Sequence, residues 1–232
     1  GGLYDLTQFE DFEEVSTRFM DTATVPYTYK DGVYALPDTQ TFSVMFYRKD
    51  ILDELGVGVP ETWDDFIAAS AVIMRNNMQV GLPYTQITDM NQVNLGLGAL
   101  NIYPTLLMQK GVSLYDDKLE SVDMTSEEAV STFTMWTDFY NKYSFPKTYD
   151  FYNRFRTGLM PLAIQSCTQY TTISAAASEI RGLWGIELIP GFKNENGNIN
   201  RSQAGAGSAC AILKSSDNVE AAWKFLKWWT SD

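Results

Sequence analysis

Histidine is absent from this chain of 232 residues, and cysteine occurs only at Cys167 and Cys210. Without histidine, neither a Ser-His-Asp nor a Cys-His catalytic group can form, and the commonest ligand of transition metals is missing. Two cysteines so far apart in the sequence make neither a zinc motif nor a disulfide framework. A single bridge or two free thiols remain, and we expect two free, buried thiols. We predict that the chain binds no metal or other cofactor.

Basic residues are scarce, because 17 Lys and Arg stand against 29 Asp and Glu and give a formal net charge of −12. Proteins bind the phosphates of nucleic acids with clustered Lys and Arg, so this acidity argues against a nucleic-acid surface. Acidic pairs are therefore the next candidates for chemistry. Glu13-Glu14, Asp64-Asp65 and Glu127-Glu128 stand near predicted helix starts, where negative charge complements the helix dipole, and Asp116-Asp117 stands in a polar turn. We interpret all four pairs as structural rather than catalytic.

Long apolar runs are also missing. The longest uncharged stretches, residues 90–109 and 157–178, contain Pro, Gly and many amide and hydroxyl side chains. A bilayer core does not accept so many polar groups, so we expect a soluble chain without a membrane span. The first residues also lack the basic region and apolar run of a signal peptide.

The residues that are present predict a packed α/β protein. Apolar residues make up 45% of the chain and aromatic residues 14%, which is enough for a globular core. Strand-like and helix-like segments alternate along the chain, which is typical of α/β layers. The expected strands and turns are strands over residues 41–47, 162–165, 183–189 and 208–213, a hairpin at Asp31-Gly32, and an exposed turn over residues 194–200.

Three helices have clear starts, and a weaker amphipathic stretch runs from Phe9 to Phe19. Thr62 and Asp65 form a capping-box pattern after Pro60, Ser126 precedes an acidic first turn, and Ser216-Asp217 opens the last helix. Apolar residues at helical spacing predict the buried faces. These faces are Trp63, Phe66, Ile67, Ser70, Ile73 and Met74; Ala129, Phe133, Trp136, Tyr140 and Tyr143; and Ala222, Phe225, Leu226 and Trp229. We expect Trp63, Trp136 and Trp229 to be core residues.

Two short segments invite a functional interpretation. Gly205-Ala206-Gly207-Ser208 lacks the lysine of a phosphate loop and precedes a strand, so we interpret it as a close-packed crossing or a hinge. The run from Gln165 to Tyr170 combines uncharged hydrogen-bonding groups with one aromatic ring after a predicted strand. That combination suits a neutral polyhydroxyl ligand, while a solvated loop is an equal alternative.

Six groups of residues, spaced along almost the whole chain, carry a family resemblance. They are Tyr34 to Pro37 with Phe46 to Leu52; Leu55 to Val57 with Pro60 to Phe66; Lys110 to Asp116; Phe155 to Gly158 with Leu162 to Ile164; Trp184 to Ile186 with Ile189 to Gly191; and Ala211 to Ser216 with Glu220 to Leu226. They are similar to family patterns such as Y-G-L-P, P-x-T-W-D-E-F, G-G-x-L-Y-D and E-A-A-W-x-F-L. The chain resembles the maltose-binding-protein-like group of extracellular solute-binding proteins, which feed ABC sugar importers.

The resemblance implies a periplasmic-binding-protein-like fold of type II, with two α/β lobes joined by crossing strands. Family members are substantially longer, so we expect an internal fragment that is mostly the second lobe. Residues 1–38 would be a remnant of lobe one, residues 39–205 lobe two, and residues 206–232 a hinge crossing and a helix returning to lobe one. The hinge crossings are expected near residues 38–42 and 203–208.

The resemblance also implies a mechanism, in which a ligand in the cleft between the lobes favours the closed form that the membrane transporter recognises. The expected ligand-facing residues are Asp38, Gln40, Thr41, Asn101, Tyr103, Gln165, Thr168 and Tyr170. No Lys or Arg is among them, so we predict a neutral sugar or oligosaccharide. The family often has Trp where Thr168 stands, so either Tyr170 takes that part or the ligand is smaller or less sugar-like.

The expected partners are the sugar and the permease subunits of an ABC importer. We expect a monomer that is not an enzyme and lies outside the cytoplasm, as a periplasmic protein or as a cell-surface lipoprotein whose anchor lies outside this chain. Two other classes stay open. One is a carbohydrate-active enzyme with two carboxylates facing one pocket. The other is a surface or sensory module without a transport role.

Overall fold

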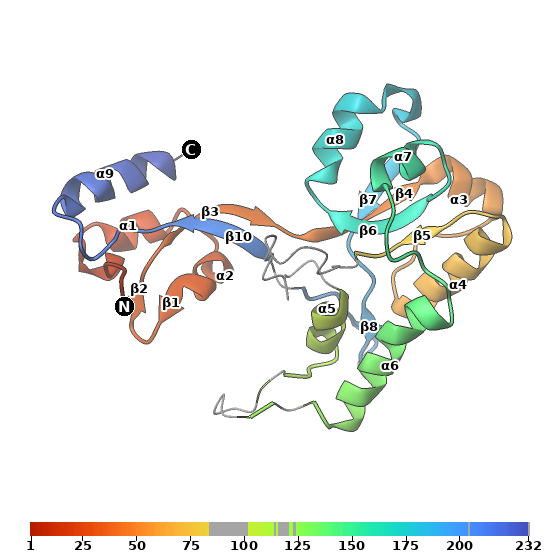
Figure 1. Cartoon of the computed structure of the whole chain (residues 1–232), viewed down its shortest axis with the longest axis horizontal. Coiled ribbons are helices and arrows are strands. Elements are labelled where there is room, and N and C mark those ends of the chain that lie inside the picture. The colour runs from red at the N-terminus through yellow and green to blue at the C-terminus, as the bar shows by residue number, and fades with distance from the viewer. Residues whose placement is uncertain (84–101, 114, 116–120, 123, 204, 232) are drawn as a thin grey trace. The chain divides into compact units, whose positions relative to one another are not determined.

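The computed structural model describes residues 1–83, 102–113, 115, 121–122, 124–203 and 205–231 (Figure 1). The chain forms two compact units, which we call unit 1 (Gly1–Thr41 with Ala206–Asp232) and unit 2 (Phe42–Gly205). Both boundaries fall inside the segments expected to be hinge crossings. Among the described residues, no helix has the length and apolar character needed to cross a membrane.

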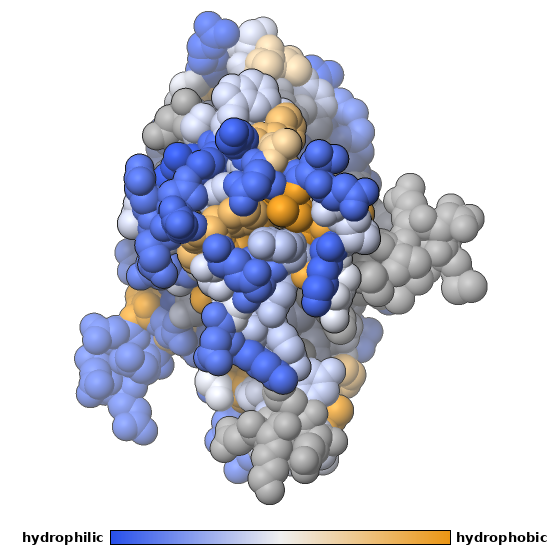
Figure 2. Space-filling view, turned by 90° about the vertical axis from the view of Figure 1, so that its left-hand side faces the viewer, coloured by the Kyte–Doolittle hydropathy of each residue, from blue (hydrophilic) through white to orange (hydrophobic). Residues whose placement is uncertain are grey.

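Unit 1 combines short helices with two pairs of strands. Its elements are η1 (Leu6–Gln8), α1 (Phe12–Ser16), α2 (Asp21–Thr24), η2 (Val25–Tyr27), β1 (Thr28–Tyr29), β2 (Gly32–Val33), β3 (Leu36–Thr41), β10 (Ala206–Cys210) and α9 (Val219–Trp229). β1 pairs with β2, and β3 pairs with β10, both antiparallel. Figure 2 looks onto a face of this unit, where hydrophilic side chains surround a smaller group of apolar ones.

The core of unit 1 joins α9 to the first helices of the chain. Trp223 and Leu226 of α9 pack with Leu6, Phe12 and other buried residues. The Trp223 indole Nε1 donates a hydrogen bond of 2.7 Å to the Asp11 carboxylate, which also forms an ion pair with Lys227. The hydrogen bond from Lys227 is the main cause that lowers the pKa of Asp11, followed by the one from Trp223. The last helix is therefore fixed to the first segment by both apolar and charged contacts.

The β3–β10 pair explains the glycine in the last strand. Gly207 lies opposite Gln40, and a Cβ atom at Gly207 would stand 2.2 Å from the backbone oxygen of Thr39. No side chain fits at that distance. The interpretation of Gly205 to Ser208 as a close-packed segment rather than a phosphate loop is confirmed at Gly207.

Unit 2 is built on one four-stranded sheet. Its elements are β4 (Ser43–Arg48), α3 (Lys49–Leu55), α4 (Trp63–Arg75), β5 (Val80–Gly81), α5 (Ile102–Gln109), α6 (Glu127–Asn141), α7 (Phe151–Arg156), β6 (Leu162–Ser166), α8 (Gln169–Ala176), η3 (Ser178–Ile180), β7 (Trp184–Glu187), β8 (Phe192–Lys193) and β9 (Ile199–Asn200). The strand order is β5-β6-β4-β7, and β8 pairs with β9 separately. β4 is antiparallel to both β6 and β7, whereas β5 is parallel to β6.

Alternate residues of β4 serve two different cores. Met45 packs with α4, α5 and α6 through residues such as Phe66 and Phe139. Phe46 points to the other face and packs with α7 and α8 through residues such as Phe155 and Ile173. The helices therefore form a layer on each side of the sheet, as Figure 1 shows.

Polar contacts fix both ends of β4. The Gln203 side chain accepts a hydrogen bond from the Ser43 backbone nitrogen and donates one to the Ser43 backbone oxygen, both 2.9 Å long. At the far end of β4, the buried Arg48 guanidinium lies 2.6 Å from the Asp50 carboxylate and donates to the backbone oxygen of Phe155. The hydrogen bond from Arg48 lowers the pKa of Asp50 below its usual value.

The helix starts and several strands agree with expectation. α4 begins with a complete capping box at Thr62 and Asp65, and Ser126 caps α6. All three acidic pairs near predicted helix starts lie in first turns. The expected hairpin is present, with Lys30-Asp31 rather than Asp31-Gly32 between its paired residues. Both cysteines are free, as expected, but each is half-buried rather than buried.

Three predicted core residues were placed wrongly. Trp63 is buried, but Phe133 is 49% exposed, Phe225 52% and Trp229 50%. In α9 the buried side chains are Trp223 and Leu226, with Val219 and Ala222 beside them, so the helix uses a neighbouring stripe with equally good spacing. Trp136 is half-buried.

Replacing Gly207 by Ala tests the close approach of β10 to β3. We expect Gly207→Ala to lower the free energy of unfolding by about 1–3 kcal/mol, the usual cost of overpacking. Gly58→Ala is the control, because a Cβ there meets no atom within 4 Å. Urea denaturation of both variants measures the difference, and equal stability would contradict the close packing.

The Arg48–Asp50 pair predicts that the free energy of unfolding depends on pH. Because the folded pKa of Asp50 is lowered, its stabilisation is complete above the unfolded pKa of about 3.9 and disappears as the pH falls through the lower folded value. We expect Asp50→Asn to cost about 1 kcal/mol at neutral pH, allowing for partial exposure, and the loss to vanish in strong acid. Denaturation at several pH values measures this. Asp53→Asn, an exposed carboxylate of the same helix, is the control, and an equal effect there would refute the assignment.

Candidate functional site

Three of the predicted ligand-facing residues lie on β3 of unit 1. Asp38 and Gln40 are exposed, and Thr41 is half-buried. The Asp38 carboxylate accepts hydrogen bonds from the Trp229 indole at 2.7 Å and from the Ser208 hydroxyl at 3.2 Å. Asp38 therefore connects β3 to β10 and to the end of α9.

The other predicted residues belong to unit 2, except that Asn101 lies outside the described residues. Tyr103 is on α5, Gln165 is on β6, and Tyr170 is in the first turn of α8, where Thr168 is the residue before the helix. Tyr170 is thus part of a helix rather than of a solvated loop.

Gln165 is held by a tyrosine from outside the predicted set. Its Nε2 donates a hydrogen bond of 2.6 Å to the Tyr149 hydroxyl, which donates one of 2.7 Å to the backbone oxygen of Leu82. Burial raises the pKa of Tyr149 strongly, and the nearby Tyr140 adds to the increase. Tyr149 therefore remains a neutral phenol that fixes the orientation of Gln165.

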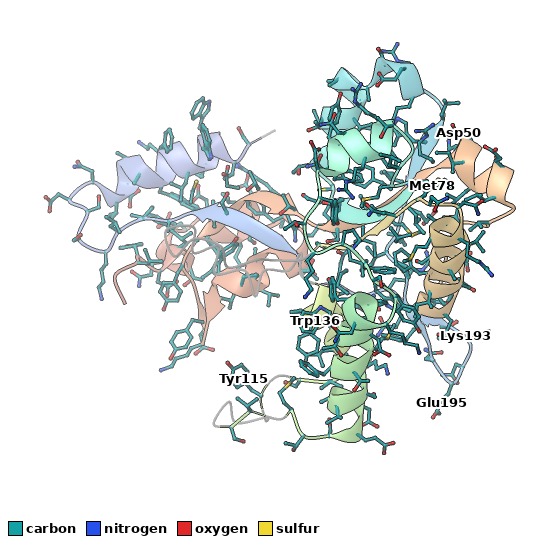
Figure 3. All side chains as sticks on the ribbon, turned by 45° about the vertical axis from the view of Figure 1, so that its right-hand side comes forward. Asp50, Met78, Tyr115, Trp136, Lys193 and Glu195 are labelled. Carbon is teal, nitrogen blue, oxygen red and sulfur yellow. The ribbon has the colours of Figure 1, made fainter. Side chains whose placement is uncertain are left out.

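A row of aromatic rings leads from Tyr140, whose charge influences the pKa of Tyr149, to Tyr103. Tyr140 approaches Trp136 with ring centroids 6.1 Å apart, and Trp136 approaches Tyr103 at 5.3 Å. The exposed Phe133 ring completes the row, 5.8 Å from Tyr103. We call this set the aromatic band: Tyr103, Phe133, Trp136, Tyr140, Tyr149 and Gln165. Figure 3 labels Trp136 on α6.

The aromatic band is uncharged and partly accessible. None of its members is ionised at neutral pH, and all except the exposed Phe133 are half-buried. Burial raises the pKa of Tyr103 as well. The Trp136 Nε1 atom is buried and has no hydrogen-bond partner in the described part of the chain. Rings with polar tips of this kind stack on the apolar faces of sugars while their polar atoms bond hydroxyl groups.

The structure does not bring Thr168 and Tyr170 into the aromatic band. The Thr168 hydroxyl is 2.9 Å from the Ser166 hydroxyl, and the Tyr170 ring packs edge-on against Trp184 at 5.5 Å. Of the unit 2 predictions within the described residues, only Tyr103 and Gln165 therefore belong to the aromatic band.

Most of the aromatic band was not predicted from the sequence. Trp136 and Tyr140 were expected to be core residues, although three aromatic rings spaced along one helix face also indicate a binding surface. No local sequence pattern indicated a role for Tyr149, because it stands outside any periodic segment. Only the folded structure brings it into contact with Gln165.

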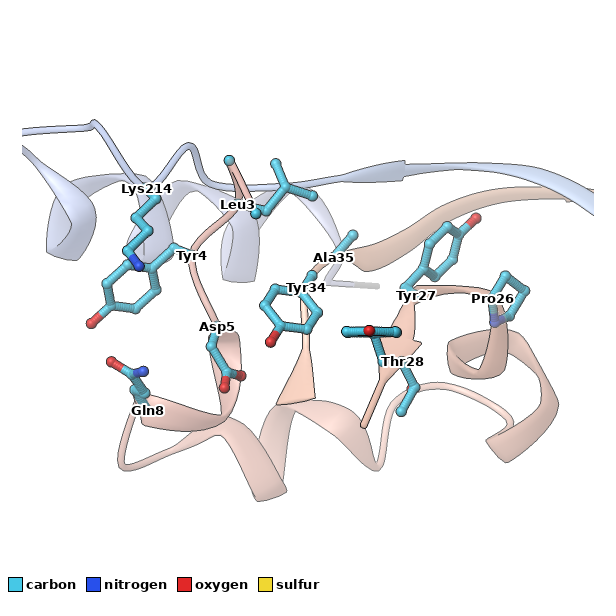
Figure 4. Close-up of a pocket in the computed structure, with 13 residues that line it drawn as sticks. Leu3, Tyr4, Asp5, Gln8, Pro26, Tyr27, Thr28, Tyr34, Ala35 and Lys214 are labelled. Carbon is cyan, nitrogen blue, oxygen red and sulfur yellow. The ribbon is translucent and has the colours of Figure 1, made fainter. Parts of the chain in front are cut away.

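Unit 1 contains a separate hollow of about 640 Å³ (Figure 4). Four tyrosines line it, together with polar residues such as Asp5, Gln8 and Lys214. None of the predicted ligand-facing residues lines it. Among the described residues, no group of three or more Cys, Asp or Glu side chains could hold a metal ion.

The family profile described as bacterial extracellular solute-binding protein matches residues 1–232. The chain belongs to this family. A curated relative, the arabinooligosaccharide-binding protein of Halalkalibacterium halodurans, is 41% identical over 54 residues, which are 22% of this chain and 12% of the relative.

Solved structures of solute-binding proteins share the fold. An ABC transporter solute-binding protein of Thermotoga lettingae bound to α-D-tagatose has a TM-score of 0.71 and 24% identity, covering 100% of this chain and 58% of its own. A maltose-bound protein of T. maritima has a TM-score of 0.73 and 21% identity, and the match covers 99% of this chain and 58% of that protein. An Agrobacterium radiobacter protein in complex with ribitol has a TM-score of 0.72 and 23% identity, and the match covers 98% of this chain and 57% of that protein. This member of the family thus spans less than two thirds of these relatives' length.

Tyr149→Phe tests the support of Gln165 in this solute-binding protein. The substitution removes the donor to Leu82 and the acceptor of Gln165, so we expect it to lower the free energy of unfolding by about 1–3 kcal/mol. Tyr170→Phe is the control, because the Tyr170 side chain is 49% exposed. Urea denaturation compares the two, and equal stability would show that the Tyr149 hydroxyl holds nothing in place.

Proposed function

We propose that this chain contributes to substrate capture for an ABC importer by binding a neutral sugar, oligosaccharide or polyol. The observation that carries the proposal is the aromatic band of unit 2, which offers ring faces and neutral polar atoms but no charge. The ligands named for the related structures, tagatose, maltose and ribitol, are all neutral polyhydroxyl compounds.

We assign unit 2 to the second lobe of the family and unit 1 to parts of the first lobe, with β3 and β10 as the hinge crossings. In this proposal the ligand contacts both lobes only in the closed form, so its binding energy favours closure. Tyr103, Gln165, Thr168 and Tyr170 would be contributed by the second lobe, and Asn101, which lies outside the described residues, is proposed as a further ligand-facing residue. Asp38, Gln40 and Thr41 would be contributed at the crossing strands.

The remaining assignments follow from the same role. The protein acts outside the cytoplasm, in the periplasm or as a lipoprotein at the cell surface, and presents its closed form to the permease subunits. It acts as a monomer, binds no nucleic acid and catalyses no reaction on the sugar.

Saturation-transfer NMR of the chain with maltose, tagatose and ribitol at millimolar concentration tests the proposal, because this method detects weak binding. We expect signals from at least one neutral ligand, and about fivefold weaker binding in Gln165→Leu, equivalent to one neutral hydrogen bond of about 1 kcal/mol. Tyr103→Leu removes a ring of the band and is expected to weaken binding similarly.

Tyr152→Leu is the matched control, because Tyr152 is a half-buried tyrosine on α7 outside the band. Thermal denaturation of each variant confirms that it is folded. Binding of charged sugars alone would contradict the proposal, as would equal losses in the Tyr103 and Tyr152 variants.

A further inference from the structure

A pocket of unit 2 lies beside β7, on residues outside the aromatic band. Its volume is about 490 Å³, within the range of small-molecule sites. Because all its walls belong to unit 2, its shape does not depend on unit 1. We call it the Lys49/Arg181 pocket; its lining residues are Tyr47, Lys49, Tyr170, Ile173, Ser174, Ala177, Arg181, Gly182, Trp184, Gly185 and Ile186.

Aromatic rings form one part of this pocket. Tyr170 and Trp184 contact each other with ring centroids 5.5 Å apart and planes at 63°. The Tyr47 hydroxyl lies so close to Gly185 that a Cβ atom there would be 2.7 Å away. The glycine thus leaves room for the Tyr47 ring, which lies on the Met45 side of the sheet. Tyr170 and Trp184, on the Phe46 side, give the pocket its flat apolar surface.

Two charged side chains, Lys49 and Arg181, line the pocket, and both are cations. Neither forms an ion pair with any described carboxylate within 4.0 Å. The carboxylates nearest to them in sequence are engaged by other arginines.

Three such ion pairs involve carboxylates that are close to Lys49, Arg181 or β7 in the sequence. Asp50, next to Lys49, pairs with Arg48 at 2.6 Å, and Glu179, two residues before Arg181, pairs with Arg156 at 2.7 Å. Glu187, at the end of β7, lies 3.6 Å from Arg201. In a chain with a net charge of −12, the pocket thus keeps two positive charges that form no ion pair with a carboxylate of the described residues.

We propose that the Lys49/Arg181 pocket binds a small organic anion in which a phosphate or carboxylate group is joined to a flat ring. The anionic group pairs with the two cations, and the ring packs against Tyr170 and Trp184. This site shares no residue with the aromatic band and only Tyr170 with the proposed sugar-facing residues, and it goes beyond the capture of a neutral sugar.

Phenyl phosphate is the test ligand, because it carries one ring and one anionic group. We expect saturable shifts of the backbone amide signals of Arg181 to Ile186 in ¹H–¹⁵N NMR spectra of the whole chain. Inorganic phosphate, which lacks the ring, and phenyl glucoside, which lacks the charge, are expected to bind at least tenfold more weakly.

The double variant Lys49→Gln/Arg181→Gln is expected to weaken phenyl phosphate binding at least tenfold. Lys142→Gln/Lys147→Gln is the control, because it removes two exposed cations of the same unit that do not line the pocket. Lys49→Arg/Arg181→Lys keeps both charges and is expected to retain binding, which separates loss of charge from loss of folding.

Three results would overturn the proposal. They are no saturable shift at β7, equal binding of inorganic phosphate and phenyl phosphate, and equal losses in the pocket and control double variants. Gln165→Leu separates this site from the sugar site, because that variant is expected to bind phenyl phosphate normally while losing affinity for neutral sugars. If phenyl phosphate binds but no neutral sugar does, the proposed function fails and the pocket stands.

Discussion

The structure of unit 2 depends on the alternation of side chains along β4. Because successive residues of a strand point to opposite faces, Met45 and Phe46 are committed to two different cores by their positions alone. A shift of one residue in the pairing with β6 would exchange the two faces and bury the wrong side chain of every pair. The layer of α4, α5 and α6 and the layer of α7 and α8 are therefore positioned by one strand, and so are the aromatic band and the Lys49/Arg181 pocket.

Sequence patterns predicted the elements that carry strong local signals. The capping box at Thr62 and the apolar spacing after it gave α4, and the run of β-branched and aromatic residues before Arg48 gave β4. No local pattern indicated β3, because Pro37 and the polar residues after it do not resemble a buried strand. Only the family resemblance led to the expectation of a crossing strand near residues 38–42. In α9 the stripe through Trp223 and the stripe through Phe225 have similar spacing, so only tertiary packing decides between them.

The candidate site was less predictable than the fold, for a physical reason. Family resemblance pointed to Tyr103 and Gln165, but their connection passes through Trp136, Tyr140 and Tyr149, which belong to other elements. Such a surface is defined by contacts between distant segments, and no local pattern encodes them. The resemblance also grouped Tyr170 with Gln165, although β6 and α8 direct these side chains to different neighbours.

The two hydrogen bonds between Gln203 and Ser43 have a consequence for how the chain folds. Unit 2 interrupts unit 1, so β3 and β10 are neighbours in space but are separated by the whole of unit 2 in sequence. Pairing such distant strands in an unfolded chain carries a large loop-closure entropy. Once unit 2 has folded, the Gln203 side chain holds the residues beside both strands together, and most of that entropy has already been lost. Folding of the inserted unit thus prepares the assembly of the unit that surrounds it in sequence.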